Sequence, residues 1–222
     1  MKTLLSFIRE SNIPYGEVVP QFKNKIDMNN PILKHFISTG LIQKYYDMKP
    51  PTDENSVSEI IHLKDIMKNA SEEEIQFALS AEVDEELCYK TFAQSIGITV
   101  PNDFVTKIMD QTDPILYFLK DHFNRARPEQ VANSFNIPFQ VKIPNTAMNP
   151  AYPSGHALDS HIMAYCIKKL APHKSEEIEQ FAKKMRDSRM NVGLHYPSDN
   201  IISKILANDI IASGLLRIPE IQ

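Results

Sequence analysis

The sequence predicts an all-α fold: one domain over residues 1–222, built as a multi-helix bundle of about seven to nine helices. Apolar residues recur at helical spacing along most of the chain, whereas alternating apolar and polar runs bounded by turn signals are scarce. Only six glycines occur, and neither an internal repeat nor a linker divides the chain. A length of 222 residues suits one well-buried domain.

The N-terminal segment is expected to be the least regular part. A short helix is predicted at about residues 2–10, and residues 12–55 read as a loop because prolines interrupt them. Within this segment a modest helix is expected over residues 30–46, where Pro31 suits a first helical turn.

Two helices are predicted in the rest of the first hundred residues. The first covers residues 56–70 and ends where Ser71 and Glu74 form a capping-box pattern. That pattern opens a second helix, which Gly97 closes. The first helix has an apolar side formed by Ile60, Ile61, Leu63, Ile66 and Met67.

The C-terminal half is predicted to be helical around one long proline-rich loop. A helix begins near Pro101, is interrupted at Pro114 and stops before Pro128. The following residues, 129–153, are expected to be irregular. Three further helices are predicted at about residues 155–170, 174–190 and 197–215.

Composition narrows the classes of function and location. The net charge of −4 gives no global basic field, so a nucleic acid polymer is not an expected partner. No stretch reaches the roughly 18 uninterrupted apolar residues of a membrane span, and no secretory signal begins the chain. We therefore expect a soluble, cytoplasmic protein. Cys88 and Cys166 are interpreted as buried free thiols.

The stretch "KDHFNRARP", residues 120–128, is the first candidate site. Lys120 and Arg127 are seven residues apart, so a continuous helix would place both on one face, and Arg125 adds charge. Such a run is either a solvated cationic face or a clamp for a dianion, because the planar fork of Arg fits phosphate oxygens. The motif alone leaves both interpretations open.

The stretch "YPSGH", residues 152–156, is the second. A glycine at the start of a helix leaves backbone N–H groups close to a bound anion, and the Ser154 hydroxyl can donate to the same anion. Alternatively, Ser154 is a simple N-cap and His156 a surface residue of the first turn. A serine-hydrolase elbow is disfavoured, because Tyr152 stands where its first glycine is required.

The stretch "SRMNVGLHYPSD" is the third. His195 and Asp199 are four residues apart, a spacing at which a carboxylate can reach back to an imidazole. Such a partner fixes the tautomer and leaves the other ring nitrogen free as nucleophile or base. Arg189 precedes His195 by six residues. The alternative is a buried histidine with a hydrogen-bond partner, or Asp199 as a helix cap.

Together the three motifs supply cations, a backbone anion site and two histidines, the set needed to displace a leaving group from phosphorus. In these motifs the sequence resembles the type 2 phosphatidic acid phosphatase (PAP2) superfamily, which includes class A bacterial acid phosphatases and vanadium haloperoxidases. The family pattern K-x6-R-P, P-S-G-H and S-R-x5-H-x3-D is matched at every position and in order within residues 117–200.

The soluble class A bacterial acid phosphatases are the closer likeness within that superfamily. They are similar in size, in lacking membrane spans, and in having an arginine like Arg125, an aromatic residue like Phe123 and a "YPSGH" motif. Those enzymes are typically exported, whereas this chain shows no signal peptide.

The resemblance implies a phosphate cradle and no metal cofactor. Lys120, Arg127 and Arg189 would hold the nonbridging phosphate oxygens, and Ser154 and the Gly155 amide would complete the cradle. The three cations take the electrostatic role that a metal has elsewhere. Phosphate or vanadate is expected to occupy the site as a ligand or inhibitor.

The resemblance also implies the chemical steps. His195 would attack phosphorus to form a phosphohistidine, with Asp199 orienting its ring. His156 would protonate the leaving alkoxide and then deprotonate water. Because His195 must be neutral while His156 is protonated, a bell-shaped pH profile on the acid to neutral side is expected. Arg125 is expected behind these groups, holding a carboxylate or the loop.

The predicted activity is hydrolysis of small phosphomonoesters, with nucleotides, sugar phosphates and pyrophosphates as candidate substrates. The leaving group is expected to contact residues 129–153 and 12–55. Two alternatives stay open: a vanadate-dependent haloperoxidase that uses the same pocket, and a non-catalytic helical protein that binds phosphate or phospholipid. A homo-oligomer is also left open, because apolar helix faces in the first hundred residues can serve a dimer as well as a core.

Overall fold

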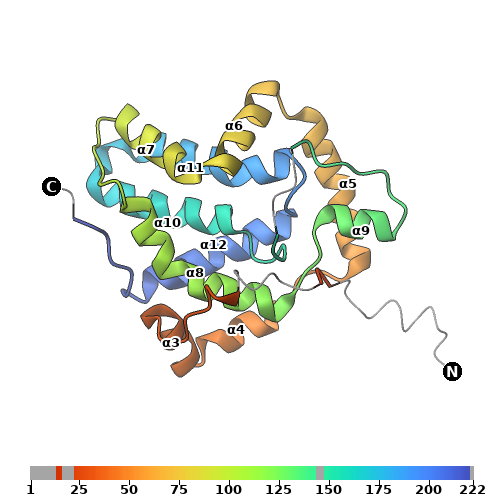
Figure 1. Cartoon of the computed structure of the whole chain (residues 1–222), viewed down its shortest axis with the longest axis horizontal. Coiled ribbons are helices and arrows are strands. Elements are labelled where there is room, and N and C mark those ends of the chain that lie inside the picture. Colours follow the sequence, from red (N-terminus) through yellow and green to blue (C-terminus); the bar gives the residue numbers. More distant parts are fainter. Residues whose placement is uncertain (1–13, 17–22, 144–147, 221–222) are drawn as a thin grey trace.

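The computed structural model describes residues 14–16, 23–143 and 148–220, and Figure 1 shows that these ranges are built from helices. Ten α-helices, α3 to α12, and one 3-10 turn follow one another along the described chain. The all-α prediction is therefore confirmed, with slightly more helices than expected. The helix predicted at residues 2–10 lies outside the described residues.

Two short helices, α3 (Pro31–Ser38) and α4 (Leu41–Asp47), replace the single helix predicted over residues 30–46. The side chain of Asn30 caps α3 by accepting hydrogen bonds from its first amides, and the proline occupies the first turn as predicted. Gly40 separates the two helices because its φ of 75° lies in the left-handed region.

Helix α5 (Asp53–Asn69) begins slightly earlier than predicted. Ile60, Leu63 and Met67 are buried, whereas Ile61 is 58% exposed, so its apolar stripe is narrower than the sequence suggests.

Helices α6 (Glu72–Val83) and α7 (Glu85–Ser95) replace one long predicted helix. The capping box is confirmed: Ser71 Oγ accepts from the Glu74 amide, and the Glu74 carboxylate accepts from the Ser71 amide. The chain breaks at Asp84, whose φ is −154° and whose carboxylate caps the first turn of α7. An aspartate side chain that satisfies backbone amides competes with helix continuation, which explains the break.

Helix α8 (Phe104–Phe123) runs through Pro114 without interruption, so the predicted break is wrong. An internal proline costs about 3 kcal/mol or more, and burial of the helix around it offsets that cost. The helix ends at Asn124, which has a left-handed φ of 44°. Lys120 and Arg127 therefore do not share one helix face, contrary to the sequence interpretation.

Helix α9 (Pro128–Ser134) lies in the segment predicted to be irregular. Its proline takes the first helical position, and the side chain of Gln130 accepts from the Arg127 amide at 2.8 Å. The helix can form because the remaining prolines of this segment come after it. The last three helices are confirmed as α10 (Gly155–Leu170), α11 (Ser175–Asn191) and α12 (Pro197–Ala212).

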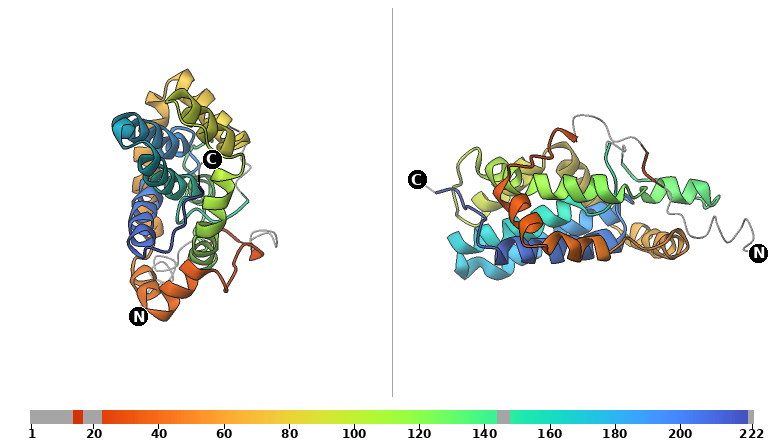
Figure 2. Two further views of the ribbon diagram at one scale, coloured as in Figure 1. Left: turned by 90° about the vertical axis from the view of Figure 1, so that its left-hand side faces the viewer. Right: turned by 90° about the horizontal axis from the view of Figure 1, so that it is seen from below.

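Helix α10 is the centre of the packing. It contacts α11, α12 and α8, and α11 contacts α6 in turn. Figure 2 shows α8 lying along one side of the layer that α10 and α12 form. Leu119, Leu158, Ile162 and Leu206 belong to the main core between these helices. This packing fixes the N-terminus of α10 beside the C-terminal half of α8.

We expect Leu158→Ala to lower the free energy of unfolding by about 2–5 kcal/mol, because the fully buried side chain would leave a cavity. Leu87→Ala is the matched control, since that leucine is 57% exposed on α7, and should change stability by no more than about 0.5 kcal/mol. Urea unfolding followed by circular dichroism measures both. Equal losses would contradict the assigned core.

Candidate active site

The three sequence motifs meet at one cavity of about 180 Å³. Helix α8, the junction of α6 and α7, the start of α10 and the end of α11 contribute to its wall. The predicted site residues that line it are Lys120, Arg127, Gly155, His156, Arg189 and His195.

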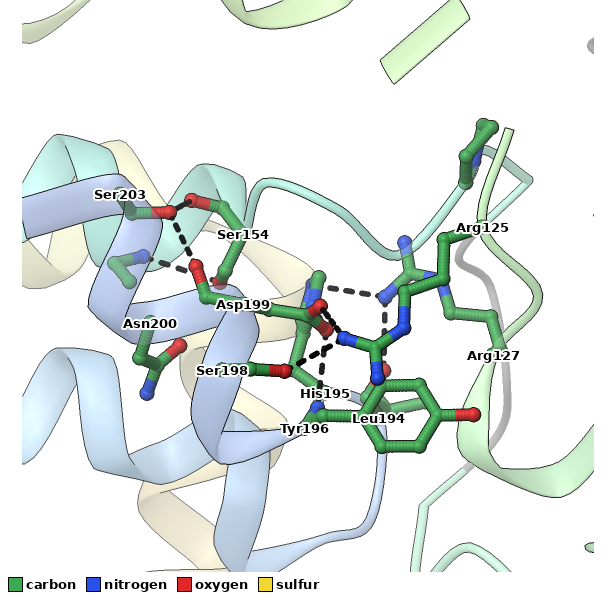
Figure 3. A network of polar contacts seen from close by, with 12 residues as sticks. Arg125, Arg127, Ser154, Leu194, His195, Tyr196, Ser198, Asp199, Asn200 and Ser203 are labelled. Carbon is green, nitrogen blue, oxygen red and sulfur yellow. Dashed lines mark hydrogen bonds and ion pairs between the residues drawn. The ribbon is translucent and has the colours of Figure 1, made fainter. Parts of the chain in front are cut away.

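His195 and Asp199 form a buried pair at the start of α12. The His195 Nδ1 lies 2.9 Å from Asp199 Oδ2, and that oxygen also accepts from the Tyr196 amide at 3.0 Å. Their side chains are only 4% and 0% exposed. Figure 3 shows the imidazole and the carboxylate close together, with the guanidinium groups of Arg125 and Arg127 beside them. Asp199 can reach back because it occupies the third position of α12, one turn after the histidine.

The protonation of the His195 ring follows from its neighbours. Arg127 Nη1 lies 2.8 Å from His195 Nε2, and an arginine can only donate. Nε2 must therefore be the acceptor, and Nδ1 carries the proton that is donated to Asp199. Burial, reinforced first by Arg127 and then by Lys120, holds the pKa of His195 well below its ordinary value. The ring is thus neutral, and the Nε2 lone pair accepts from Arg127 at the wall of the cavity.

Arg127 is held rigidly at the N-cap of α9. Its Nε and Nη2 donate to the backbone and side-chain oxygens of Asn149, each at 3.0 Å, and Nη1 also donates to the Leu194 carbonyl at 2.9 Å. Burial lowers the pKa of Arg127 to about 10, so the guanidinium stays charged at neutral pH.

Lys120 projects from the last turn of α8 into the same cavity. Its Nζ donates to the Pro150 carbonyl at 2.5 Å. Burial, followed by the charge of Arg127, lowers the pKa of Lys120 well below its ordinary value. One hydrogen bond offsets little of the cost of burying an ammonium group, so a nearby anion would stabilise its charged form strongly.

Arg189 is 2% exposed and lines the cavity from α11. Its Nη2 forms an ion pair with Glu82. Within the described part of the chain, its Nε and Nη1 have no hydrogen-bond partner. Buried donors without partners are costly, so this guanidinium has unused donors for a ligand in the cavity.

The "PSGH" turn begins α10 as the sequence suggests, but not all of its residues line the cavity. Ser154 is fully buried, does not line the cavity, and its Oγ accepts from the Ala157 amide at 3.4 Å as the N-cap. Gly155 does line the cavity, and a Cβ added there would lie 3.4 Å from the Leu116 side chain. The helix thus presents bare backbone to the cavity, where its amides and dipole favour an anion.

His156 lies at the edge of the cavity, with its side chain 20% exposed. Its Nε2 is 3.3 Å from the Ala81 carbonyl and 3.5 Å from Glu85 Oε2. Burial, and then the charge of Arg189, lowers the pKa of His156 well below its ordinary value. A bound dianion would act in the opposite direction and favour the protonated ring.

Arg125 does not line the cavity and lies behind Asp199. Its Nη1 donates to Asp199 Oδ1 and to Ser198 Oγ, both at 2.7 Å. Its Nη2 donates to Glu59 at 2.8 Å, and the guanidinium stacks 3.7 Å from the Tyr196 ring centroid. Arg125 therefore fixes the carboxylate that fixes His195.

The sequence analysis missed the acidic part of the cavity wall, formed by Glu82, Glu85, Asp113 and Asp159. One signal was available: Asp159 follows His156 by three residues on α10, so both lie on one helix face. The glutamates come from a different helix pair, and no spacing in the sequence connects them to the motifs. Burial raises the pKa of Glu85 to about 8 and that of Asp159 well above its ordinary value.

The described residues offer no group of three or more metal-ligating side chains that could hold a metal ion. They also include no helix with the length and hydropathy of a membrane span.

We expect inorganic phosphate and orthovanadate to raise the melting temperature, because a ligand that binds only the folded state stabilises it, by about 2.7 kcal/mol at a hundred times Kd. Arg189→Gln should reduce this shift, since the unpartnered donors are lost. Lys184→Gln, a change on the same helix at a half-buried side chain that does not line the cavity, is the control and should retain it. Equal shifts in all three proteins would contradict anion binding at Arg189.

Comparison with protein-family models finds no match, and comparison with curated protein sequences finds none either. Among solved structures, the first bacterial vanadium-dependent iodoperoxidase matches with a TM-score of 0.54 and 17% identity over 75% of this chain. A transmembrane PAP2-type phosphatidylglycerolphosphate phosphatase from Bacillus subtilis matches with a TM-score of 0.45 and 14% identity, covering 71% of this chain and 85% of that one. This chain spans about half of the iodoperoxidase, 48% of its length. At this level of identity the likeness establishes the fold: the chain has the haloperoxidase-type helical fold that the sequence predicts.

Proposed function

We propose that this chain is a metal-independent phosphatase of the PAP2/haloperoxidase superfamily, which hydrolyses small phosphomonoesters through a phosphohistidine on His195. One observation carries the proposal. A buried, neutral imidazole is oriented by Asp199, and its unprotonated Nε2 accepts from Arg127 at the wall of a cavity that Lys120 and Arg189 also line. A neutral nitrogen nucleophile beside concentrated positive charge is the arrangement that phosphoryl transfer requires.

Phosphate binding is the first step. Lys120 and the unpartnered nitrogens of Arg189 take nonbridging oxygens, and the Gly155 amide at the start of α10 takes another. Arg127 Nη1 releases its hydrogen bond to the imidazole and donates to the phosphate instead, which frees the lone pair on His195 Nε2. Ser154 supports the cradle as the N-cap from which α10 begins.

Displacement follows. His195 Nε2 forms a bond to phosphorus while the bond from phosphorus to the ester oxygen breaks, and the leaving oxygen receives the His156 proton. The phosphorylated ring is positively charged, and Asp199 stabilises it through the Nδ1 hydrogen bond. His156, now neutral, removes a proton from water. The resulting hydroxide attacks phosphorus, and the N–P bond breaks to release phosphate and restore His195.

The vanadate-dependent haloperoxidase is the second candidate, favoured by the fold shared with the iodoperoxidase. Vanadate has the tetrahedral oxyanion geometry of phosphate, so Lys120, Arg127 and Arg189 would hold it, with His195 Nε2 as its protein ligand. When bound, it supplies the oxidising chemistry with peroxide. Iodide oxidation by the vanadate-loaded protein and hydrogen peroxide tests this candidate, and its absence would remove it.

We expect His195→Ala to lower kcat by about 10³-fold or more on any substrate, because no phosphohistidine can form. His156→Gln should cost about 10²–10⁴-fold on ethyl phosphate and less on 4-nitrophenyl phosphate, whose phenolate leaves without a proton. The assay uses EDTA and a panel of nucleotides, sugar phosphates and pyrophosphates. His161→Gln on the same helix is the control, as it does not line the cavity. Full turnover by His195→Ala, or an absolute need for a divalent metal, would overturn the mechanism.

The pH dependence follows from the two histidines. The lowered pKa of His195 keeps it neutral below pH 6.5, so the acid limb of kcat/KM lies below the ordinary histidine value. Because the pKa of His156 is lowered, the free enzyme does not hold the proton that His156 donates. The monoanion of the phosphate ester must bring this proton, and the second pKa of such an ester is about 6. We therefore expect kcat/KM to fall about tenfold per pH unit above that value. Initial rates between about pH 4 and pH 9 measure this. A maximum in the alkaline range would contradict these assignments.

A further inference from the structure

The cavity is divided by charge along two of its helices. On α8, Lys120 and Asp113 both face the cavity, two turns or about 10 Å apart along the axis. On α10, Gly155 begins the helix at the phosphate end, and Asp159 lies one turn further in. Lys120 and the start of α10 therefore lie toward one end of the cavity, and Asp113 and Asp159 lie toward the other, where Lys25 also lines the wall.

Two of the four wall carboxylates are already neutralised by protein cations. Glu82 pairs with Arg189, and Asp113 pairs with Lys25 at 2.9 Å. The other two, Glu85 and Asp159, have no lysine or arginine partner among the residues that the structure describes.

Asp159 is the clearest unused group. It is 3% exposed, it lines the cavity, and within the described ranges its carboxylate makes neither a hydrogen bond nor an ion pair. Glu85 Oε1 is likewise buried without a hydrogen-bond partner in those ranges, while Oε2 lies 3.5 Å from His156. Burying two carboxylates near each other is costly unless a proton or another cation compensates them. A ligand that brings a positive charge would remove that cost.

An organic ammonium fits this place better than a metal ion. Two carboxylates can accept from the several N–H donors of one ammonium group. Calcium takes six to eight oxygen ligands and zinc takes four ligands, whereas the described residues provide no group of three candidate metal-ligating side chains.

We propose that Glu85 and Asp159 form a subsite for the ammonium group of a short aminoalkyl phosphate. This inference rests on the proposed phosphatase function and names the substrate class. The phosphate lies among Lys120, Arg127 and Arg189, and a short aliphatic chain leads from the ester oxygen to the carboxylates. The bond from phosphorus to that oxygen breaks, and an amino alcohol leaves with its ammonium unchanged. Leaving groups that carry a carboxylate are repelled by the same wall.

The test uses three esters that share a phosphate and a two-carbon skeleton: 2-aminoethyl phosphate, ethyl phosphate and 2-phosphoglycolate. We expect kcat/KM of the native enzyme to fall in that order, with the ammonium ester preferred over ethyl phosphate by about tenfold or more. Asp159→Asn should bring this ratio close to one, and Glu85→Gln should reduce it. Asp103→Asn, a change at a fully exposed carboxylate, should leave the ratio unchanged.

A binding measurement separates this inference from the proposed function. Calorimetry compares 2-aminoethylphosphonate with ethylphosphonate, neither of which can be hydrolysed as an ester. Tighter binding of the aminophosphonate to the native protein, lost in Asp159→Asn, supports the subsite even if no ester is turned over, in which case the phosphatase proposal alone fails. Hydrolysis of all three esters at similar rates overturns the subsite alone. A preference that appears only with added divalent metal also overturns it. If Asp159→Asn does not fold, as judged by circular dichroism, the ratio in Glu85→Gln decides.

Discussion

The buried carboxylate of Asp199 connects all three segments that build the site. The two carboxylate oxygens accept from His195, from the Tyr196 amide and from Arg125. The backbone carbonyl of Asp199 accepts from the Ser154 amide at 3.3 Å. The first segment, the "PSGH" turn and the third segment thus bond to one residue. A charge buried this deeply is tolerated only when such partners surround it. The position of the His195 ring therefore depends on segments that are far apart in sequence.

The arginines on the two sides of that carboxylate differ in their partners. Arg125 lies behind it and is satisfied by protein groups alone, including Glu59 and Ser56. Arg189, on the cavity side, keeps two nitrogens without protein partners in the described structure. The difference separates a cation that maintains the architecture from one that is available to a ligand, although both are predicted from the sequence as site residues. Burial strengthens both roles, because the low dielectric magnifies every unpaired charge.

The sequence predicted the helical class, the last three helices and the residues that meet at the cavity, because helical periodicity and short motifs are local properties. It failed where tertiary packing decided the outcome. Pro114 does not interrupt α8, since the surrounding burial outweighs its local cost. Asp84 divides one predicted helix into two, because its side chain caps the next one. The acidic wall could not be predicted, because Glu85 on α7 and Asp159 on α10 come to line one cavity only in the folded chain.

The hydrogen bond between Arg127 and His195 has a consequence for chemical selectivity. While Arg127 donates to Nε2, the lone pair of His195 is covered, so an electrophile that cannot draw the guanidinium away meets no free ring nitrogen. In the proposed mechanism a phosphate monoanion competes for that donor, and in doing so it exposes the nitrogen that attacks it. Discrimination against uncharged electrophiles would then reside in one exchangeable hydrogen bond, with no moving lid required. The hydrogen bond from Arg127 lowers the basicity of the His195 ring and would also prevent its reaction until an oxyanion binds.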